Sequence, residues 1–422
     1  MRISNVADGS YELPRISSMG ESAARKACFQ FLSRLSQGRL LVTEGGTTEC
    51  FGEAAESAEI VAHIVVEKPA IFRAMMLGGT IGAAESYMEG DWHTPDLVAV
   101  VRLMVVNMDV MQSMEGSRSV LAGFALKVFG WLHRNTVDRA RKNIVAHYDL
   151  GNDFYALFLD RSMMYSAAIF PSADSDINTA AKFKLQHICQ RLQLKSDDHL
   201  LEIGTGWGGL AIHAAKHFGC RVTTTTISEA QYDYACERVA EEGLQDRITL
   251  LKQDYRELAG SYDKLVSVEM IEAVGYEYYR SYFTQCSALL KQDGLMLLQG
   301  ITIADQRYEE SKESVDFIKR YVFPGGCLPS VSSISSHVAL DTNMQIIGQQ
   351  DITLHYARTL NAWRERFFDR IDEVRAMGFD DSFIRLWEFY LCYCEGGFLE
   401  RVIGTSQWLI AKPSFKNMPE IR

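Results

Sequence analysis

The chain has little of what marks secreted, metal-binding or nucleic-acid-binding proteins. Its nine cysteines are scattered and form no CxxC pair, so neither a disulfide framework nor a zinc site is indicated. The formal net charge of -11 argues against nucleic-acid binding, because phosphate neutralisation needs a basic surface. We therefore expect no bound metal ion and no nucleic-acid partner.

Long hydrophobic runs are also missing. The opening MRISNVADGSYELPRISSMG has no apolar segment typical of a secretory signal. The most apolar run, residues 97–106, is interrupted by Arg102 and falls well short of a membrane-spanning helix. We expect a cytoplasmic protein whose contact with the inner face of the membrane is peripheral.

One basic stretch is a candidate for that contact. It is formed by Lys127, Arg134, Arg139, Arg141 and Lys142. A local patch of positive charge attracts an anionic surface even when the net charge of the protein is negative. A solvated helix followed by a linker has the same composition, so both interpretations stay open.

What the chain does contain is enough apolar sequence for two domains. Hydrophobic residues make up 47% of its 422 residues, and this length exceeds the usual size of one domain. Residues 1–130 predict a smaller mixed α+β domain, because a helical segment is followed by alternating strand-like segments. Residues 131–143 are polar and basic and predict a linker, which leaves residues 144–422 as the second domain.

The second domain alternates short apolar runs with segments of helical length. The apolar runs are residues 199–204, 220–227, 248–254, 264–270 and 294–303. Strands joined by helices imply a parallel sheet with crossover helices. The fold class is therefore predicted to be α/β and Rossmann-like, with a mostly parallel sheet.

The most specific motif is LLEIGTGWGG at residues 200–209. A buried strand ends here, Gly204, Gly206 and Gly208 form a tight turn, and a helix begins. Glycine is needed because a side chain would prevent a ligand from approaching the turn backbone. With Glu202 the pattern is E-x-G-x-G-x-G, which favours S-adenosylmethionine over a dinucleotide. A nicotinamide or flavin cofactor and a purely structural turn are the weaker alternatives.

Two further positions are predicted to contact the cofactor. The second strand lacks the carboxylate that usually binds the ribose, and Gln231, at the start of the next helix, is predicted to supply similar polar contacts. Asp254 and Tyr255 follow the third strand and are placed to meet the adenine. As an alternative, Asp254 caps a turn.

Four further motifs occur in order along the chain, namely HYDLGNDFYALFLD (147–160), FPGGCLPS (323–330), HYARTLNAW (355–363) and WEFYLCYCEGGF (387–398). In these motifs the chain resembles the cyclopropane fatty acid synthases, which methylate double bonds of lipid acyl chains using S-adenosylmethionine. The resemblance implies a class I methyltransferase domain. It also implies that residues 1–130 are an accessory, lipid-facing domain.

The resemblance assigns roles to particular residues. It implies a set of cofactor contacts, namely Tyr165, Ser166, Gly204, Gly206, Ile227 and Gln231. It also implies that Glu272 and Tyr356 belong to the reaction centre and that Tyr155 lies close to it. From the sequence pattern alone, Tyr356 is equally an ordinary buried tyrosine.

The chain departs from the family where a bicarbonate ion normally serves as catalytic base. The family's cysteine and histidine positions are Ala167 and Gln299 here, and Glu269 stands where a glycine is common. A carboxylate is planar and anionic like bicarbonate, so we hypothesise that Glu269 replaces the ion. Repulsion between Glu269 and Glu272 would raise the pKa of one of them. As an alternative, Glu269 caps the following turn in solvent.

The favoured reaction is methylene addition across a cis double bond of a phospholipid acyl chain, which forms a cyclopropane. The main alternative is methylation without ring closure, giving a methylene- or methyl-branched unsaturated chain. From other classes, a non-catalytic lipid carrier and a methyltransferase for a small soluble metabolite are also considered. Homodimerisation, head-group preference, double-bond position and the binding of bicarbonate stay open.

Overall fold

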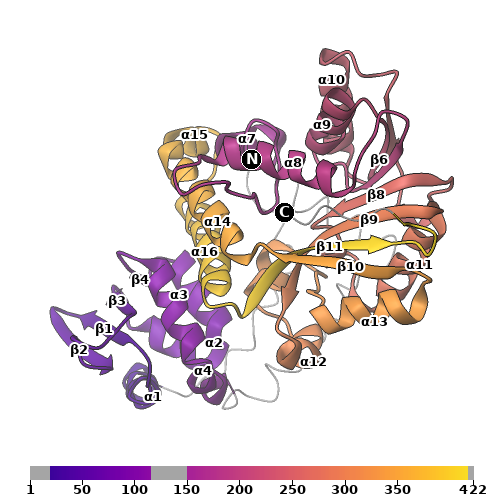
Figure 1. The fold of residues 1–422 in the computed structure, drawn as a ribbon. Helices are drawn as coiled ribbons and strands as arrows, with labels where there is room; N and C mark the ends of the chain where they lie inside the picture. Colours follow the sequence, from indigo (N-terminus) through magenta and orange to yellow (C-terminus); the bar gives the residue numbers. More distant parts are fainter. Residues whose placement is uncertain (1–19, 116–149, 417–422) are drawn as a thin grey trace. The chain divides into compact units, whose positions relative to one another are not determined.

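The computed structural model describes residues 20–115 and 150–416, which form two compact units (Figure 1). Unit 1 contains residues 20–115, Glu313–Val322 and Phe368–Val402. Unit 2 contains residues 150–312, Phe323–Phe367 and 403–416. The predicted linker 131–143 and the basic stretch lie outside the described residues.

Unit 1 contains a small mixed sheet with the strand order β2-β1-β3-β4. Its strands are β1 (Arg39–Glu44), β2 (Thr47–Gly52), β3 (Val61–Val66) and β4 (Trp92–His93). β1 pairs antiparallel with β2 and parallel with β3. The helical elements of this unit are α1 (Glu21–Leu32), α2 (Ala70–Met88), α3 (Leu97–Val106), α4 (Met108–Glu115), η4 (Ile318–Val322), α15 (Ile371–Ala376) and α16 (Asp381–Leu399).

Helix α16 belongs to unit 1, although the boundary predicted from the sequence assigned it to the second domain. The Tyr87 hydroxyl donates to Glu388 at 2.7 Å, and Arg102 forms an ion pair with Glu400 at 2.5 Å. Gly396 lies so close to Val101 that a Cβ at this position would be 2.6 Å from its side chain. These contacts join segments far apart in the sequence. A domain boundary drawn along the chain therefore could not predict them.

Unit 2 is an α/β unit around one large sheet, with the strand order β10-β11-β9-β8-β5-β6-β7. The strands are β5 (His199–Ile203), β6 (Arg221–Thr226), β7 (Ile248–Lys252), β8 (Tyr262–Val268), β9 (Leu290–Ile303), β10 (Gln345–Asp351) and β11 (Ile403–Ala411). The five strands predicted from the sequence are all present and pair in parallel. The last two, β10 and β11, add an antiparallel edge. Figure 1 shows β8, β9, β11 and β10 side by side.

Helices cover both faces of this sheet. They are α7 (Asn152–Phe158), α8 (Ile177–Arg191), α9 (Gly209–Phe218), α10 (Glu229–Glu241), α11 (Tyr279–Leu289), α12 (Asp305–Glu313), α13 (Val331–Asp341) and α14 (Thr353–Asp369). Successive strand residues point to opposite faces. Leu200 and Val266 therefore join the core beneath α8 and α9, whereas Leu201 and Leu265 join the core beneath α11 and α13. Burial on both faces explains why the strands are continuous apolar runs in the sequence.

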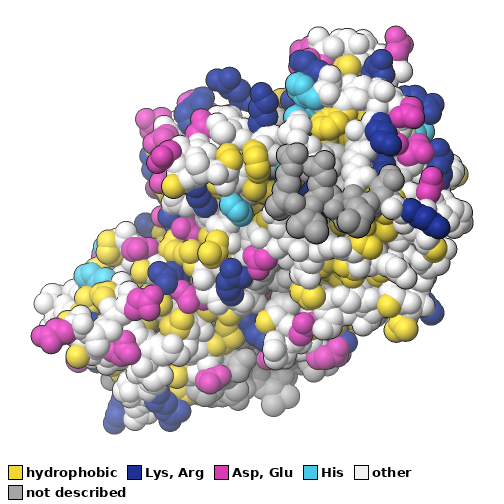
Figure 2. Space-filling view, viewed as in Figure 1, with side chains coloured by type: hydrophobic (Ala, Val, Ile, Leu, Met, Phe, Trp, Pro, Cys, Tyr) yellow, Lys and Arg dark blue, Asp and Glu magenta, His cyan; other side chains and the backbone are white. Residues whose placement is uncertain are grey.

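The surface carries charges of both signs. On the face drawn in Figure 2, lysine and arginine side chains are intermixed with aspartate and glutamate. Among the described residues, no helix is both long and apolar enough to cross a membrane.

Candidate active site

The glycine turn follows β5 at the carboxyl end of the parallel strands, where ligands bind in sheets of this kind. Gly204, Gly206 and Gly208 have φ values of +102°, +51° and +84°, a region that side-chain-bearing residues rarely adopt. The Gly204 amide donates to the Thr225 carbonyl at 3.1 Å, which ties the turn to β6. A Cβ placed on Gly206 would meet no atom within 4 Å. The backbone surface is therefore open, and it fits a ligand that approaches the turn closely.

Glu202 lies beneath the turn rather than on its open surface. Its carboxylate is buried and accepts a hydrogen bond from the Thr224 hydroxyl at 2.6 Å. Thr224 in turn contacts the Thr205 hydroxyl at 2.7 Å. Burial raises the pKa of Glu202 to about 8, and the Thr224 hydrogen bond offsets this only in part. Glu202 thus connects β5, β6 and the turn through a hydrogen-bonded group that is largely protonated at neutral pH.

The raised pKa of Glu202 predicts a pH dependence of stability. Because its folded pKa of about 8 exceeds the ordinary 4.5, its contribution is complete below pH 4.5 and is lost as the pH rises through 8. For one proton the slope is at most about 1.4 kcal/mol per pH unit. Glu202→Gln is therefore expected to lose less stability than the wild type between pH 6 and 9, measured by thermal unfolding. Glu257→Gln, at an exposed position, is expected to follow the wild type; equal slopes in all three proteins would contradict the assignment.

The predicted contacts after β6 lie at the start of α10. Ser228 caps this helix, since its hydroxyl accepts from the Gln231 amide at 3.3 Å. The Gln231 side chain is buried, and its carbonyl oxygen accepts from the Thr226 hydroxyl at 3.0 Å. Ile227 is half-buried between the strand and the helix. These residues therefore form the connection from β6 to α10, where the sequence placed the cofactor contacts.

Asp254 and Tyr255 have protein partners of their own. Asp254 caps the short helix η1 (Tyr255–Glu257) and pairs with the Arg256 guanidinium at 2.7 Å. Burial raises the pKa of Asp254, but the hydrogen bonds and the charge of Arg256 together lower it by more, so the pKa lies below its ordinary value. The Tyr255 ring is buried against Tyr282, with centroids 5.5 Å apart. Asp254 thus forms the turn cap that was the alternative interpretation, and contact of both residues with adenine stays a prediction.

Glu269 points into the protein and is held by three donors. Its Oε1 accepts from the Ala167 amide at 2.9 Å and from Gln299 Nε2 at 2.8 Å. Its Oε2 accepts from the Tyr356 hydroxyl at 2.8 Å. The position that carries a cysteine in the family still supplies a donor, because the donor at Ala167 is the backbone. The structure thus brings together Glu269, Gln299 and Tyr356, and Glu269 does not cap a turn in solvent.

The backbone of Glu269 is itself unusual. Its φ of +48° is one of four positive values among the described non-glycine residues. A left-handed conformation costs a residue with a Cβ roughly 1–2 kcal/mol. A strained residue of this kind persists only where its surroundings fix it, and here the Glu269 amide also donates to the Gln299 carbonyl at 2.8 Å. Glu269 therefore has a backbone conformation that suits glycine, and the contacts of its side chain and amide hold it there.

Glu272 lies one turn further, in the short helix η2 (Ile271–Ala273). Its Oε1 accepts from the Ile301 amide at 2.5 Å, whereas its buried Oε2 has no hydrogen-bond partner among the described residues. Burial and the neighbouring charge of Glu269 together raise the pKa of Glu272 to about 8. Burial also raises the pKa of Glu269, although Lys184 and the three donors oppose the rise. Lys184 and the three donors therefore favour the ionised form of Glu269, whereas burial and Glu269 favour the protonated form of Glu272.

Lys184 is a site residue that the sequence analysis missed. Its side chain has no exposed surface, and its Nζ donates to the Ser166 hydroxyl at 2.6 Å. Burial lowers the pKa of Lys184 to about 8, while the charges of Glu269 and Asp160 oppose the change. A signal was present, because Lys184 falls on the buried stripe of α8 together with Ala180, Ala181 and Ile188. A lysine on an apolar helix face indicates a buried partner of opposite charge.

Aromatic rings line the neighbourhood of these groups. Tyr155 is fully buried, with ring centroids 5.0 Å from Trp207 and 5.3 Å from Tyr165. Trp363 lies 5.3 Å from Tyr165 and 6.2 Å from Tyr356. Tyr155 thus contacts Tyr165 directly, and Trp363 links Tyr165 to Tyr356. The sequence analysis identified neither Trp363 nor Trp207, which packs against Tyr155. Such a wall excludes water and offers ring faces to a cation.

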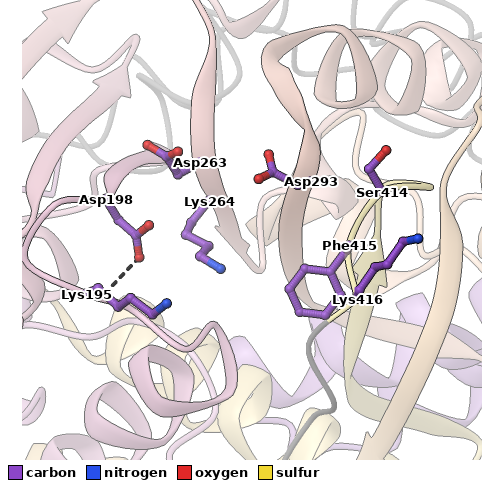
Figure 3. A pocket seen from close by; sticks show the side chains of 8 residues that line it. All are labelled: Lys195, Asp198, Asp263, Lys264, Asp293, Ser414, Phe415 and Lys416. Carbon is purple, nitrogen blue, oxygen red and sulfur yellow. Dashed lines mark hydrogen bonds between the residues drawn. The ribbon is translucent and has the colours of Figure 1, made fainter.

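A separate polar cavity of about 220 Å³ lies at the amino ends of the strands (Figure 3). It is lined by Lys195, Asp198, Asp263, Lys264, Asp293, Ser414, Phe415 and Lys416. Asp198 directly precedes β5, and Asp263 and Lys264 begin β8. In a parallel sheet this edge is opposite the glycine turn, and three lysines face three aspartates there. The cavity is therefore distinct from the candidate active site.

Substitution of Gly206 tests whether the glycine turn binds the cofactor. Gly206 and Gly243 both have positive φ, +51° and +66°, and a Cβ on either meets no protein atom within 4 Å. Alanine at either position therefore carries a similar backbone cost. Only Gly206→Ala is expected to weaken binding of S-adenosylmethionine, by about tenfold or more, because a methyl group forced into a close contact costs about 1–3 kcal/mol. Calorimetric titration measures this, and equal affinities of the two variants would contradict it.

The sheet order, the glycine turn and the polar site at the strand ends define a class I methyltransferase. Solved structures support this fold. One is the crystal structure of the mycolic acid cyclopropane synthase CmaA1 complexed with SAH and CTAB. It aligns with a TM-score of 0.59 and 27% identity, and the alignment covers 64% of this chain and 98% of that one. Coclaurine N-methyltransferase shares the fold with a TM-score of 0.60 at 19% identity, covering 78% of this chain and 98% of that one.

Residues 135–408 match the family model described as mycolic acid cyclopropane synthetase, and the chain belongs to this family. The tuberculostearic acid methyltransferase UfaA1 of Mycobacterium tuberculosis is 35% identical, over 89% of this chain and 87% of its own. The cyclopropane-fatty-acyl-phospholipid synthase of Escherichia coli is 36% identical, over 81% of this chain and 86% of its own. The protein is thus an S-adenosylmethionine-dependent methyltransferase of the cyclopropane synthase type.

Proposed function

We propose that this protein adds a methylene group across the cis double bond of an unsaturated phospholipid acyl chain, forming a cyclopropane, with Glu269 as the base. The observation that carries the proposal is the Glu269 carboxylate, held by Ala167, Gln299 and Tyr356 at the carboxyl end of the sheet. The relationship to the cyclopropane-fatty-acyl-phospholipid synthase of Escherichia coli supports the choice of substrate.

The residues around Glu269 suit each step of this chemistry. S-adenosylmethionine supplies an electrophilic methyl group, so that a C–C bond to the alkene forms as the C–S bond breaks and positive charge develops on the acyl chain. The aromatic wall of Tyr155, Tyr165 and Trp363 excludes water and stabilises this charge. Glu269 accepts a proton from the new methyl group, and the electron pair of that C–H bond closes the ring.

In this proposal the Glu269 carboxylate replaces a bound bicarbonate ion. Three donors already hold the carboxylate, and the charge of Lys184 favours its ionised form, so an added anion would meet like charge. Glu272 is protonated at neutral pH because burial and Glu269 raise its pKa to about 8. A neutral Glu272 fixes η2 to β9 by accepting from the Ile301 amide. Because it is already protonated, it does not compete with Glu269 for the proton of the new methyl group.

Methylation without ring closure is the second candidate. It is favoured by the relationship to the tuberculostearic acid methyltransferase UfaA1. That relative matches 89% of this chain, whereas the synthase of Escherichia coli matches 81%. In that reaction loss of a proton from the acyl chain next to the cation gives a methyl-branched unsaturated chain. If a hydride first shifts between the two acyl carbons, loss of a proton from the new methyl group gives a methylene-branched chain. The position of the basic oxygen relative to the bound acyl chain decides between the two outcomes.

Incubation of the purified protein with vesicles of an unsaturated phospholipid and trideuteromethyl S-adenosylmethionine tests the proposal. Ring closure and formation of a methylene branch each remove one deuteron from the methyl group, whereas loss of a proton from the acyl chain, which gives a methyl branch, removes none. Mass spectrometry of the fatty acids distinguishes these products, and derivatisation of double bonds separates a ring from a methylene branch. Absence of label in the lipid fraction would contradict both candidates. Co-sedimentation with the same vesicles tests the peripheral membrane contact that the proposal includes.

A further inference from the structure

A row of glutamines crosses the sheet of unit 2 and ends at Glu269. Gln350 pairs with Gln407 between β10 and β11, and Gln407 pairs with Gln299 between β11 and β9. Paired residues on neighbouring strands present their side chains on the same face. Gln299 and Gln407 have no exposed surface. Buried amides at matching positions must satisfy one another, because an unpaired buried polar group is costly.

Between Arg191 and Glu269 the hydrogen bonds of this row run in one direction, and Gln350 is a branch that accepts from Arg191 Nη1 at 3.3 Å. Arg191 Nη1 donates to Gln407 Oε1 at 3.1 Å, and Gln407 Nε2 donates to Gln299 Oε1 at 2.9 Å. Gln299 Nε2 then donates to Glu269 Oε1 at 2.8 Å. An amide can be turned end for end, but a guanidinium can only donate and an ionised carboxylate can only accept. The direction is therefore fixed by the two charged groups at its ends and by the Ala167 carbonyl, which also accepts from Gln299 Nε2 at 3.2 Å.

We propose that Arg191 is a positioning residue for the catalytic base, acting through Gln407 and Gln299 to keep a donor directed at the Glu269 carboxylate. The inference rests on the proposed function, in which Glu269 accepts the proton. A protonated Glu269 would suit the reversed row, in which its hydroxyl donates to Gln299 Oε1. Arg191 opposes that reversal, because its N–H groups would then face the Gln407 amide nitrogen. Arg191 thus favours the ionised, basic form of Glu269, although the side-chain amides of Gln407 and Gln299 lie between them.

Other titratable groups of the described residues face the two ends of the row. Lys184 from α8, Glu272 from η2 and Tyr356 from α14 face Glu269. His187 faces the Arg191 end, where its Nε2 lies 2.7 Å from Gln350 Oε1. Replacement of Arg191 leaves all four in place. A change in the protonation of Glu269 in such a variant is therefore attributable to the row.

The test compares Arg191→Met with Arg191→Lys, which keeps a donor. For Arg191→Met we expect the acidic limb of the kcat/KM profile for methyl transfer to move to higher pH. The activity below that limb should fall about threefold to tenfold, the effect of losing one hydrogen bond. Arg191→Lys should recover most of the loss, and the affinity for S-adenosylmethionine should not change. Arg247→Met is the matched control, because the exposed Arg247 donates to the Gly219 carbonyl outside the row.

Two further measurements separate this inference from a structural role and from the proposed function. In a Gln299→Leu background, Arg191→Met should have no additional effect on the pH profile, since the row is already broken. Infrared titration of the Glu269 carboxylate, with Glu269→Gln as the blank, reports its protonation without any turnover. A shifted titration in Arg191→Met supports the inference even if no lipid is methylated, in which case the proposed function fails alone. An unshifted titration, or a pH profile equal to that of Arg247→Met, overturns it.

Discussion

Replacing Glu269 with glutamine is expected to lower the rate of methyl transfer about 100- to 10,000-fold, the range for a positioned general base. Glutamine keeps the size of the side chain but has no basic oxygen. Its amide nitrogen would also face the donors that now surround the carboxylate, namely the Ala167 amide, Gln299 Nε2 and the Tyr356 hydroxyl. The measurement is the initial rate of label transfer from S-adenosylmethionine to phospholipid at saturating cofactor. Glu237→Gln, at an exposed position of α10, serves as the control.

Glycine at the same position gives a contrasting expectation. The φ of +48° suits glycine, so Glu269→Gly should relieve backbone strain while it opens the space that the carboxylate fills. Added bicarbonate is then expected to restore activity to Glu269→Gly but not to Glu269→Gln, whose side chain still occupies the site. Full activity of the glutamine variant without bicarbonate would remove Glu269 from the mechanism. Equal responses of both variants to bicarbonate would remove the idea that the carboxylate stands in for the ion.

Much of the candidate site was predictable because its residues are of unusual type for their positions. Two glutamates at the end of an apolar strand stand out without any coordinates, whereas Gln299 and Tyr356 were identified only through the family resemblance. The sequence did not indicate that the Ala167 amide would take the place of a side-chain donor, because a backbone group leaves no trace in residue identity. Arg191 and Gln407 were missed for another reason. Their importance lies in a contact between helix α8 and a strand far away in the sequence, which residue type alone does not indicate.

Some parts of the fold were also predictable from the sequence, and others were not. Strands β5, β6, β8 and β9 are mostly buried on both faces, so they stand out in the sequence. Strands β10 and β11 form the antiparallel edge of the sheet, and polar residues such as Gln350 and Gln407 interrupt their apolar pattern. Helix α16 is clearly helical in its sequence pattern, yet its partners in unit 1 are almost three hundred residues away. Local periodicity thus predicts the elements, and tertiary packing decides where they go.

Replacing Lys184 with methionine is expected to reduce activity strongly at low and neutral pH while leaving the fold intact. Methionine preserves the volume of the buried side chain and removes its charge. The cation of Lys184 opposes the rise in the pKa of Glu269 that burial causes. A nearby opposite charge changes a carboxyl pKa by about 1–3, so the ionised fraction of Glu269 below its pKa should fall about 10- to 1,000-fold. The acidic limb of the activity profile should therefore move to higher pH.

The pKa of Lys184 itself sets the upper end of this effect. Because burial lowers it to about 8, the wild type loses the cation as the pH rises above that value. The activity profiles of the wild type and of Lys184→Met should therefore converge between pH 9 and 10, after being far apart at pH 6 to 7. Lys216→Met, which removes an exposed lysine paired with Glu242, is the matched control. A loss of activity in Lys184→Met that is the same at every pH would mean that the lysine acts by packing or by holding Ser166, and not through its charge on Glu269.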